Sequence, residues 1–172
     1  EDRHYSRRTR DVALAAQVAD RFLEALDGQH SYFTAADLAD FARWRTRFDD
    51  MIRTGQIEPA YLIFARFQQR NRERLRYAIA QLQNEPAWTL EERYELDRDQ
   101  APWPRGAPEL DELWRQKVKS DGLSLVLTGK SWSEAADILR KRYERVLQRS
   151  EKVTSDDVFE TLMNAYATAY DP

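Results

Sequence analysis

Apolar residues recur along this chain at three- and four-residue steps, which is the spacing of one face of an α-helix. The first stripe predicts a helix over residues 8–26 and consists of Ala15, Val18, Ala19, Phe22, Leu23 and Leu26. Gly28 follows it, and glycine tolerates the left-handed conformation common after a helix end. A second stripe predicts a helix that opens at Thr34, whose hydroxyl can cap free amides, and that stops at Gly55.

Proline and capping residues separate the middle segments. Pro59 suits a first helical turn, and the stripe behind it predicts a long helix to about residue 83. Thr89 and Glu92 have the spacing of a capping box, which predicts a short helix ending near Leu96. Residues 97–108 contain three prolines and one tryptophan, so we expect an ordered loop there.

The last third of the chain again has helical periodicity. We expect a helix over residues 109–128, although residues 123–127 could instead form a short strand. Ser131 and Glu134 make a second capping box, and a final helix begins near Ser155. The pattern predicts six or seven helices with no repeat, and therefore an all-α, irregular bundle in a single domain over residues 1–172.

Composition excludes several classes of chemistry. The chain has 172 residues, a net charge of -3, no cysteine and only two histidines, so thiolate zinc sites and disulfides are excluded and catalytic triads are poorly supplied. Its five glycines form no phosphate-binding loop. The longest apolar run, residues 60–65, is far short of the ~20 residues of a membrane span. We therefore expect no cofactor, no metal, no nucleic-acid partner and no membrane span.

Charged side chains offer few candidates for a site. Asp97 begins a stretch like a calcium loop, but Ala101 and Pro108 stand where ligands are required. Arg66, Arg70 and Arg74 share one helix face, which suits either a nucleic-acid or anionic-lipid surface or, as we favour, a solvated, salt-bridged face. Helical spacing also predicts the ion pairs Asp111–Arg115 and Asp137–Lys141.

Two tryptophans are the candidate protein-contact residues. Trp88 and Trp103 flank breaks between helices rather than lying on apolar stripes. Such residues either anchor loops to the body of the protein or present an aromatic surface to a partner. No residue of this chain is a catalytic, cofactor-binding or metal-binding candidate, so the residues alone predict an interaction or structural role.

Five blocks of this sequence resemble, in order, the N-terminal region of bacterial tail-specific proteases, also called C-terminal processing peptidases, of the S41-type serine protease family. The blocks are residues 26–33 (LDGQHSYF), 67–75 (FQQRNRERL), 109–115 (ELDELWR), 141–144 (KRYE) and 156–166 (DDVFETLMNAY). The chain stops at Asp171-Pro172, where similar proteins continue towards a PDZ domain, so we expect a fragment that ends just before that domain.

The resemblance implies a parent protein that is a periplasmic serine endopeptidase acting on proteins with apolar C-termini. It implies a non-catalytic domain that encloses the protease core, gates substrate and contacts a lipoprotein adaptor, with the PDZ domain and protease core as its further partners. None of the family's catalytic or PDZ motifs lies within these 172 residues. The alternative is an autonomous helical interaction module unrelated to proteolysis, which a reading frame ending at Pro172 would favour.

Overall fold

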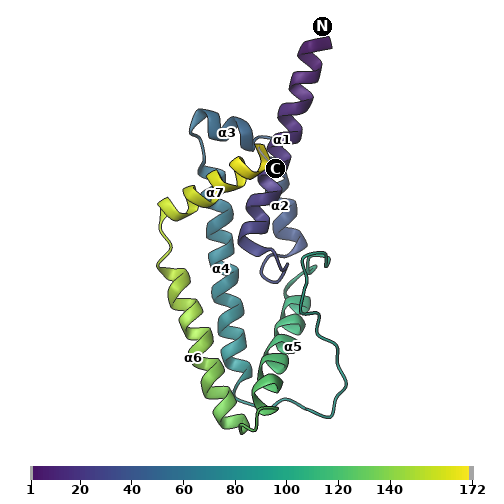
Figure 1. Ribbon diagram of the computed structural model, residues 1–172, viewed down its shortest axis with the longest axis vertical. Helices are drawn as coiled ribbons and strands as arrows, with labels where there is room; N and C mark the ends of the chain where they lie inside the picture. The colour runs from purple at the N-terminus through teal and green to yellow at the C-terminus, as the bar shows by residue number, and fades with distance from the viewer. Residues whose placement is uncertain (1, 171–172) are drawn as a thin grey trace. The chain divides into compact units, whose positions relative to one another are not determined.

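The computed structural model describes the backbone of residues 2–170 and the side chains of residues 12–170. The described residues contain seven helices and no strand, which confirms the predicted all-α class. In chain order the helices are α1 (Asp2–Asp27), α2 (Ala35–Arg45), α3 (Phe48–Thr54), α4 (Glu58–Gln81), α5 (Ala107–Val126), α6 (Trp132–Glu151) and α7 (Ser155–Tyr170) (Figure 1).

The helices belong to two compact units. Unit 1 comprises residues 1–28, 35–67 and 153–172, and unit 2 comprises residues 29–34 and 68–152. Helix α4 therefore contributes its first turns to unit 1 and its later turns to unit 2. The expectation of a single domain over residues 1–172 stays a prediction, which a test for one cooperative unfolding transition would address.

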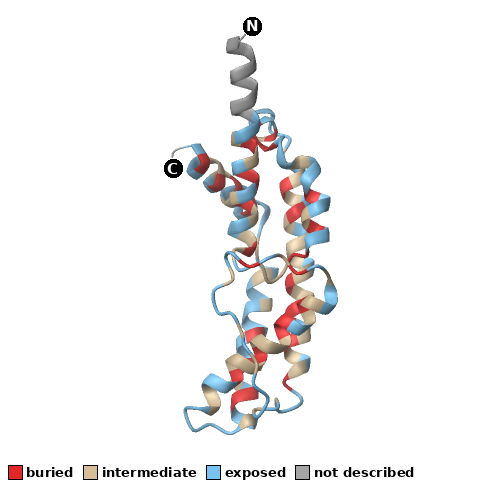
Figure 2. Ribbon diagram, turned by 90° about the vertical axis from the view of Figure 1, so that its right-hand side faces the viewer, coloured by how far each residue is buried: buried red, intermediate tan, exposed pale blue. Residues whose placement is uncertain are grey.

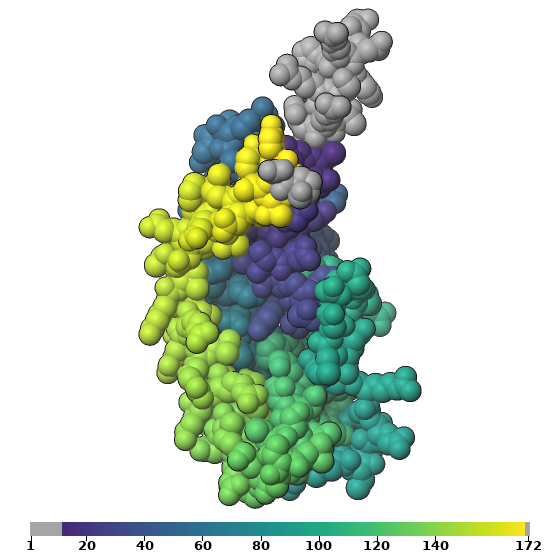
Figure 3. All heavy atoms as spheres, viewed as in Figure 1, coloured from purple at the N-terminus to yellow at the C-terminus, as the bar shows by residue number. Residues whose placement is uncertain are grey.

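Unit 1 is built around α1, which packs against α2, α3 and α7. Helix α7 (yellow) lies directly against α1 (purple) in the space-filling view (Figure 3). Phe22 of α1 meets Phe48 of α3 with ring centroids 6.1 Å apart. The buried apolar residues of this unit include Ala15, Val18, Phe22, Phe41, Phe48, Met51, Ala60, Ile63, Val158, Leu162 and Ala165.

Ion pairs also join the helices of unit 1. The carboxylate of Asp37 on α2 is 1% exposed and pairs with the guanidinium of Arg66 on α4. Arg45 at the end of α2 binds Asp20 of α1, with 2.6 Å between Nη2 and Oδ2. The first pair has one buried partner, so it constrains α2 against α4 more than an exposed pair would.

The predicted helix from Thr34 to Gly55 is in fact two helices. The chain turns between α2 and α3, where the amide of Arg47 donates to the carbonyl of Trp44 at 2.9 Å. The break lets Phe48 and Met51 enter the core of unit 1. Gly55 stops α3 as predicted, in the left-handed conformation with φ 72°.

Unit 2 packs α5 against α6, and residues 68–81 of α4 complete its core. Buried residues (red) follow the inward faces of these helices (Figure 2). Trp114 is 1% exposed, and its indole N–H donates to the carbonyl of Ser31 at 2.7 Å. The core consists of Leu75, Ala78, Leu82, Leu110, Trp114, Val118, Ala136, Leu139 and Tyr143.

One local prediction in unit 2 is wrong. The short helix from Thr89 to Leu96 does not form, because the carboxylate of Glu92 binds cations of α5 instead of closing a capping box. The helix predicted over residues 109–128 is confirmed, since α5 continues to Val126 and the alternative strand at residues 123–127 does not form. The capping box of Ser131 and Glu134 is confirmed at the start of α6.

The two predicted ion pairs have different outcomes. Asp137 and Lys141 pair at 3.1 Å, as helical spacing predicts. Asp111 instead pairs with Arg74 of α4, which is a tertiary contact that local spacing cannot indicate. Arg115 binds Glu112 and Glu92 rather than Asp111.

Candidate functional site

The candidate site lies on the long non-helical stretch between α4 and α5, here called the connecting segment (residues 82–106). It contains Trp88 and Trp103, the two residues that the sequence predicts as protein contacts. The segment runs beside α5 in unit 2 (Figure 1). Since it lacks helical hydrogen bonds, side-chain contacts hold it in place.

Trp103 is attached to residues 29–34. Its ring stacks on His30 with centroids 3.7 Å apart and an interplanar angle of 23°. The Nδ1 atom of His30 lies 2.5 Å from the carbonyl oxygen of Ala101, a hydrogen bond if that nitrogen carries the proton. His30 has a φ of 48°, a strained conformation for a residue with a side chain, and the stack and hydrogen bond offset that strain.

The side chain of Gln29 binds the same part of the segment. Its Oε1 accepts from the backbone N–H of Arg98 at 2.8 Å, while its Nε2 donates to Asp97 at 3.3 Å. One face of Trp103 therefore rests on a fixed platform. The ring also lines a hollow of about 580 Å³ together with Arg98 and Leu113.

Trp88 is held by a second tryptophan. Its ring meets Trp132 of α6 edge-to-face at 5.8 Å, and its indole N–H donates to Glu85 at 2.7 Å. Gly122 of α5 makes room for this pair, because a Cβ there would lie 2.8 Å from Trp132 and 3.5 Å from Trp88. The glycine inside α5 thus serves packing in unit 2.

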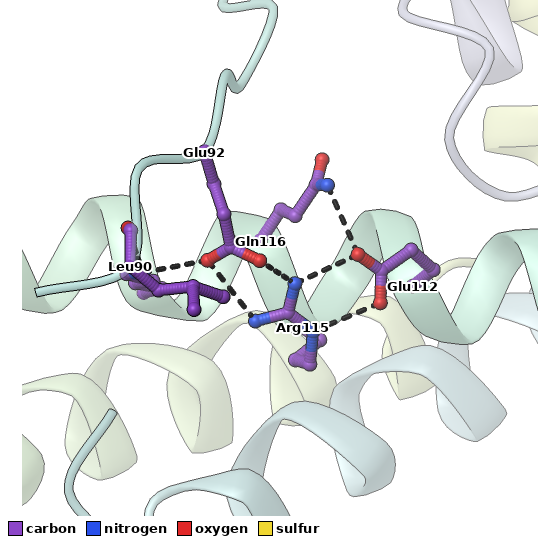
Figure 4. Close-up of polar contacts among 6 residues, drawn as sticks. Leu90, Glu92, Glu112, Arg115 and Gln116 are labelled. Carbon is purple, nitrogen blue, oxygen red and sulfur yellow. Dashed lines mark hydrogen bonds and ion pairs between the residues drawn. The ribbon is translucent and has the colours of Figure 1, made fainter. Parts of the chain in front are cut away.

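Glu92 forms the main electrostatic anchor of the connecting segment. Its carboxylate accepts hydrogen bonds from Arg115 and from Lys119, the latter at 2.6 Å (Figure 4). Arg115 also binds Glu112 at 2.7 Å, and Lys119 donates to the carbonyl of Leu90 at 2.9 Å. The hydrogen bonds from Arg115 and Lys119 lower the pKa of Glu92 to about 2.

A second polar cluster lies between α5 and α6. The buried hydroxyl of Tyr143 donates to Asp121 at 2.7 Å, and Lys117 binds the same carboxylate at 3.0 Å. Burial, and then the charge of Asp121, raises the pKa of Tyr143. The Tyr143 hydroxyl stays neutral, and the Asp121 carboxylate is paired with Lys117. The cluster therefore resembles a structural network more than a general-base site.

The described residues contain neither a candidate metal-ligand cluster nor a candidate membrane-spanning helix. No three potential metal-ligating side chains gather anywhere in the part of the chain that the structure describes. None of its described helices combines the length and apolarity that crossing a bilayer requires. Arg66, Arg70 and Arg74 are paired with Asp37, Glu73 and Asp111 respectively, as the salt-bridged interpretation predicts, but Arg74 is buried rather than solvated.

The sequence identified the tryptophans but not what surrounds them. Trp88 and Trp103 lie on one segment, yet they rest on different supports, α6 and residues 29–34. The Glu92 anchor was missed, because Arg115 and Lys119 are 23 and 27 residues away in sequence. The protein-contact role of both tryptophans stays a prediction.

An all-helical domain with paired charges and a long anchored segment is what the described residues define. The family of tail-specific protease N-terminal domains matches this chain over residues 1–172, and the chain belongs to that family. It is similar to the tail-specific protease of Haemophilus influenzae, with 30% identity over 170 residues. That alignment covers 98% of this chain and 24% of the relative, so the chain spans about a quarter of the relative's length.

Proposed function

We propose that this chain is the non-catalytic N-terminal domain of a periplasmic serine endopeptidase that processes or degrades proteins from their C-termini. The observation that carries the proposal is the family match over residues 1–172, together with a relative named as a tail-specific protease. The family match and the name of this relative both support a parent that is a protease. The serine mechanism, the apolar C-terminal substrates and the periplasmic location are the further parts of the proposal.

The domain's contribution is geometric. We assign it the enclosure of the protease core and the gating of substrate, so that an unfolded tail enters while folded protein is excluded. Its charges support this role, because arginines such as Arg66 and Arg74 are paired within their own unit. Paired charges leave a mixed surface with little steering of one ligand type.

Partner contact is assigned to the connecting segment. The ring of Trp103 stacks on His30 and also lines a hollow. A rigid aromatic side chain at the edge of a hollow is a frequent anchor in protein interfaces. The family resemblance implies three possible partners: a lipoprotein adaptor, the PDZ domain and the protease core.

Deletion of residues 1–172 from the parent protein tests the gating role. We expect the truncated enzyme to cleave folded proteins that the complete enzyme spares, measured on one folded and one unfolded substrate with the same tail. The matched control replaces the domain with that of the Haemophilus influenzae relative, which is 30% identical. Unchanged substrate choice and rate after deletion would contradict the proposal.

A fractionation experiment tests the location. The parent protein is expressed in its own cell with an epitope at its C-terminus, and periplasmic and cytoplasmic fractions are compared with marker enzymes. We expect the protein in the periplasmic fraction, and recovery with the cytoplasmic marker would refute that part of the proposal.

A further inference from the structure

Residues 91–95 form a non-helical stretch of backbone that ends at a bend at Leu96. The backbone runs without a turn or bend from Glu91 to Glu95. Exposure alternates along residues 91–95, as it does along a strand with one covered side. Glu92 and Tyr94 are partly buried and line a hollow beside α5, whereas Arg93 and Glu95 are exposed. Leu96, at the bend, borders the same hollow but is itself exposed.

The backbone of this stretch is unpaired. Within the described part of the chain, no backbone N–H or C=O group from Glu91 to Leu96 bonds to another protein group. An exposed row of such groups is a template on which a further extended chain can pair. Glu92 fixes the template in place through Arg115 and Lys119, so little ordering remains to be done on binding.

A hollow with a mixed polar and apolar lining accompanies this edge. It has a volume of about 210 Å³ and lies between the extended stretch and α5. Leu96 and Leu123 border it and are 81% and 39% exposed. The charges in its wall, Glu92 and Lys119, neutralise each other at 2.6 Å. The hollow therefore suits one apolar side chain of an added strand.

The charged residues around this edge indicate which charge the residues flanking the apolar side chain of an added strand should carry. Arg93 is an exposed cation of the stretch, but exposed carboxylates outnumber it. They are Glu91, Glu95, Asp97 and Asp99. Complementary flanks are basic, since like charges across a pairing edge are destabilising.

We propose that residues 91–96 bind an extended polypeptide by strand addition, with an apolar residue in the hollow beside Leu123 and lysine or arginine on either side. This inference rests on the proposed function, in which the domain meets unfolded substrate. The occupant is an internal, unfolded stretch of a protein substrate, captured through its backbone and one apolar side chain.

Hydrogen exchange of the full-length parent protein tests the site directly. The probe is the amidated peptide Lys-Thr-Val-Leu-Val-Thr-Lys, whose integrity is checked by mass spectrometry in the same samples. We expect slower amide exchange at residues 91–96 when the peptide is present. If these amides are already slow without peptide, the rest of the chain or a second copy covers the edge, and the proposal is overturned.

Protein variants locate the hollow. Leu123→Asp is expected to weaken peptide affinity by about tenfold or more, since it places a charge in the hollow. Leu127→Asp is the matched control, because Leu127 is an exposed leucine just beyond the same helix, outside the hollow. Equal affinities of the two variants would refute the assignment.

Methylated peptides separate strand pairing from simple apolar contact. Backbone N-methyl groups on alternate residues block one edge of an extended peptide, and shifting them by one residue blocks the other edge. We expect one peptide to lose binding and the other to retain it, whereas equal binding of both would overturn strand addition. Deletion of residues 1–172 is scored in a separate experiment. If the deletion alters substrate choice but Leu123→Asp binds the peptide as the wild type does, the strand-addition inference fails and the proposed function stands.

Discussion

Neutralising Glu92 is the perturbation that most directly tests how the connecting segment is held. Glu92→Gln keeps the shape of the side chain but removes the negative charge that binds Arg115 and Lys119 (Figure 4). We expect lower stability at neutral pH. Glu91→Gln is the matched control, because Glu91 is exposed and takes no part in the anchor.

The magnitude follows from the pKa of Glu92. A fall from 4.5 to about 2 corresponds to about 3 kcal/mol if it is fully expressed in the free energy of unfolding. Solvent screening reduces this value, because the Arg115 side chain is 33% exposed and its second partner, Glu112, is 54% exposed. We therefore expect Glu92→Gln to lower the free energy of unfolding by about 1–2 kcal/mol at pH 7.

The pH dependence has a definite sign. Since the pKa of Glu92 is lower in the folded protein, its contribution is present above about pH 4.5 and is lost as the pH falls toward 2. Denaturant unfolding at several pH values should show the wild-type and Glu92→Gln curves converging in that range. A pH-independent difference, or an equal loss in Glu91→Gln, would refute the role of this charge.

Three further substitutions test packing and pairing, each by denaturant unfolding. Trp114→Phe should cost about 2 kcal/mol, since it removes the hydrogen bond to the carbonyl of Ser31 and leaves a small cavity. Gly122→Ala should lower stability by about 1 kcal/mol, because overpacking against Trp132 outweighs the gain in helix propensity; a stabilised variant would contradict this. Asp37→Asn should cost about 2 kcal/mol by weakening the pair with Arg66, and an unchanged midpoint would show that the pair contributes nothing.

Helical periodicity predicted most of the elements because it is a local property. The long helix after Pro59, the capping box of Ser131 and Glu134, and the stop at Gly55 all depend on residues within a few positions of one another. The same reasoning failed at Thr89, whose partner Glu92 has the correct spacing but is bound by α5. A tertiary ion pair there outweighs a local cap worth about 1 kcal/mol.

The candidate site was predicted only in part. Trp88 and Trp103 were found because they stand outside apolar stripes, in a stretch rich in proline. Their supports could not be found, since His30 is 73 positions from Trp103 and Trp132 is 44 positions from Trp88. The non-helical stretch at residues 91–96 was hidden by a capping-box pattern that predicted helix there.

Local periodicity and residue types are enough to predict an all-α chain that has no cysteine and no phosphate-binding loop. The sequence also carries, in order, the blocks that place the chain in a family of protease N-terminal domains. Packing of the helices is needed to see which charges pair across them, where the second predicted helix breaks, and how the connecting segment is held. These features depend on groups distant in sequence, whose contact energies arise only when the helices pack.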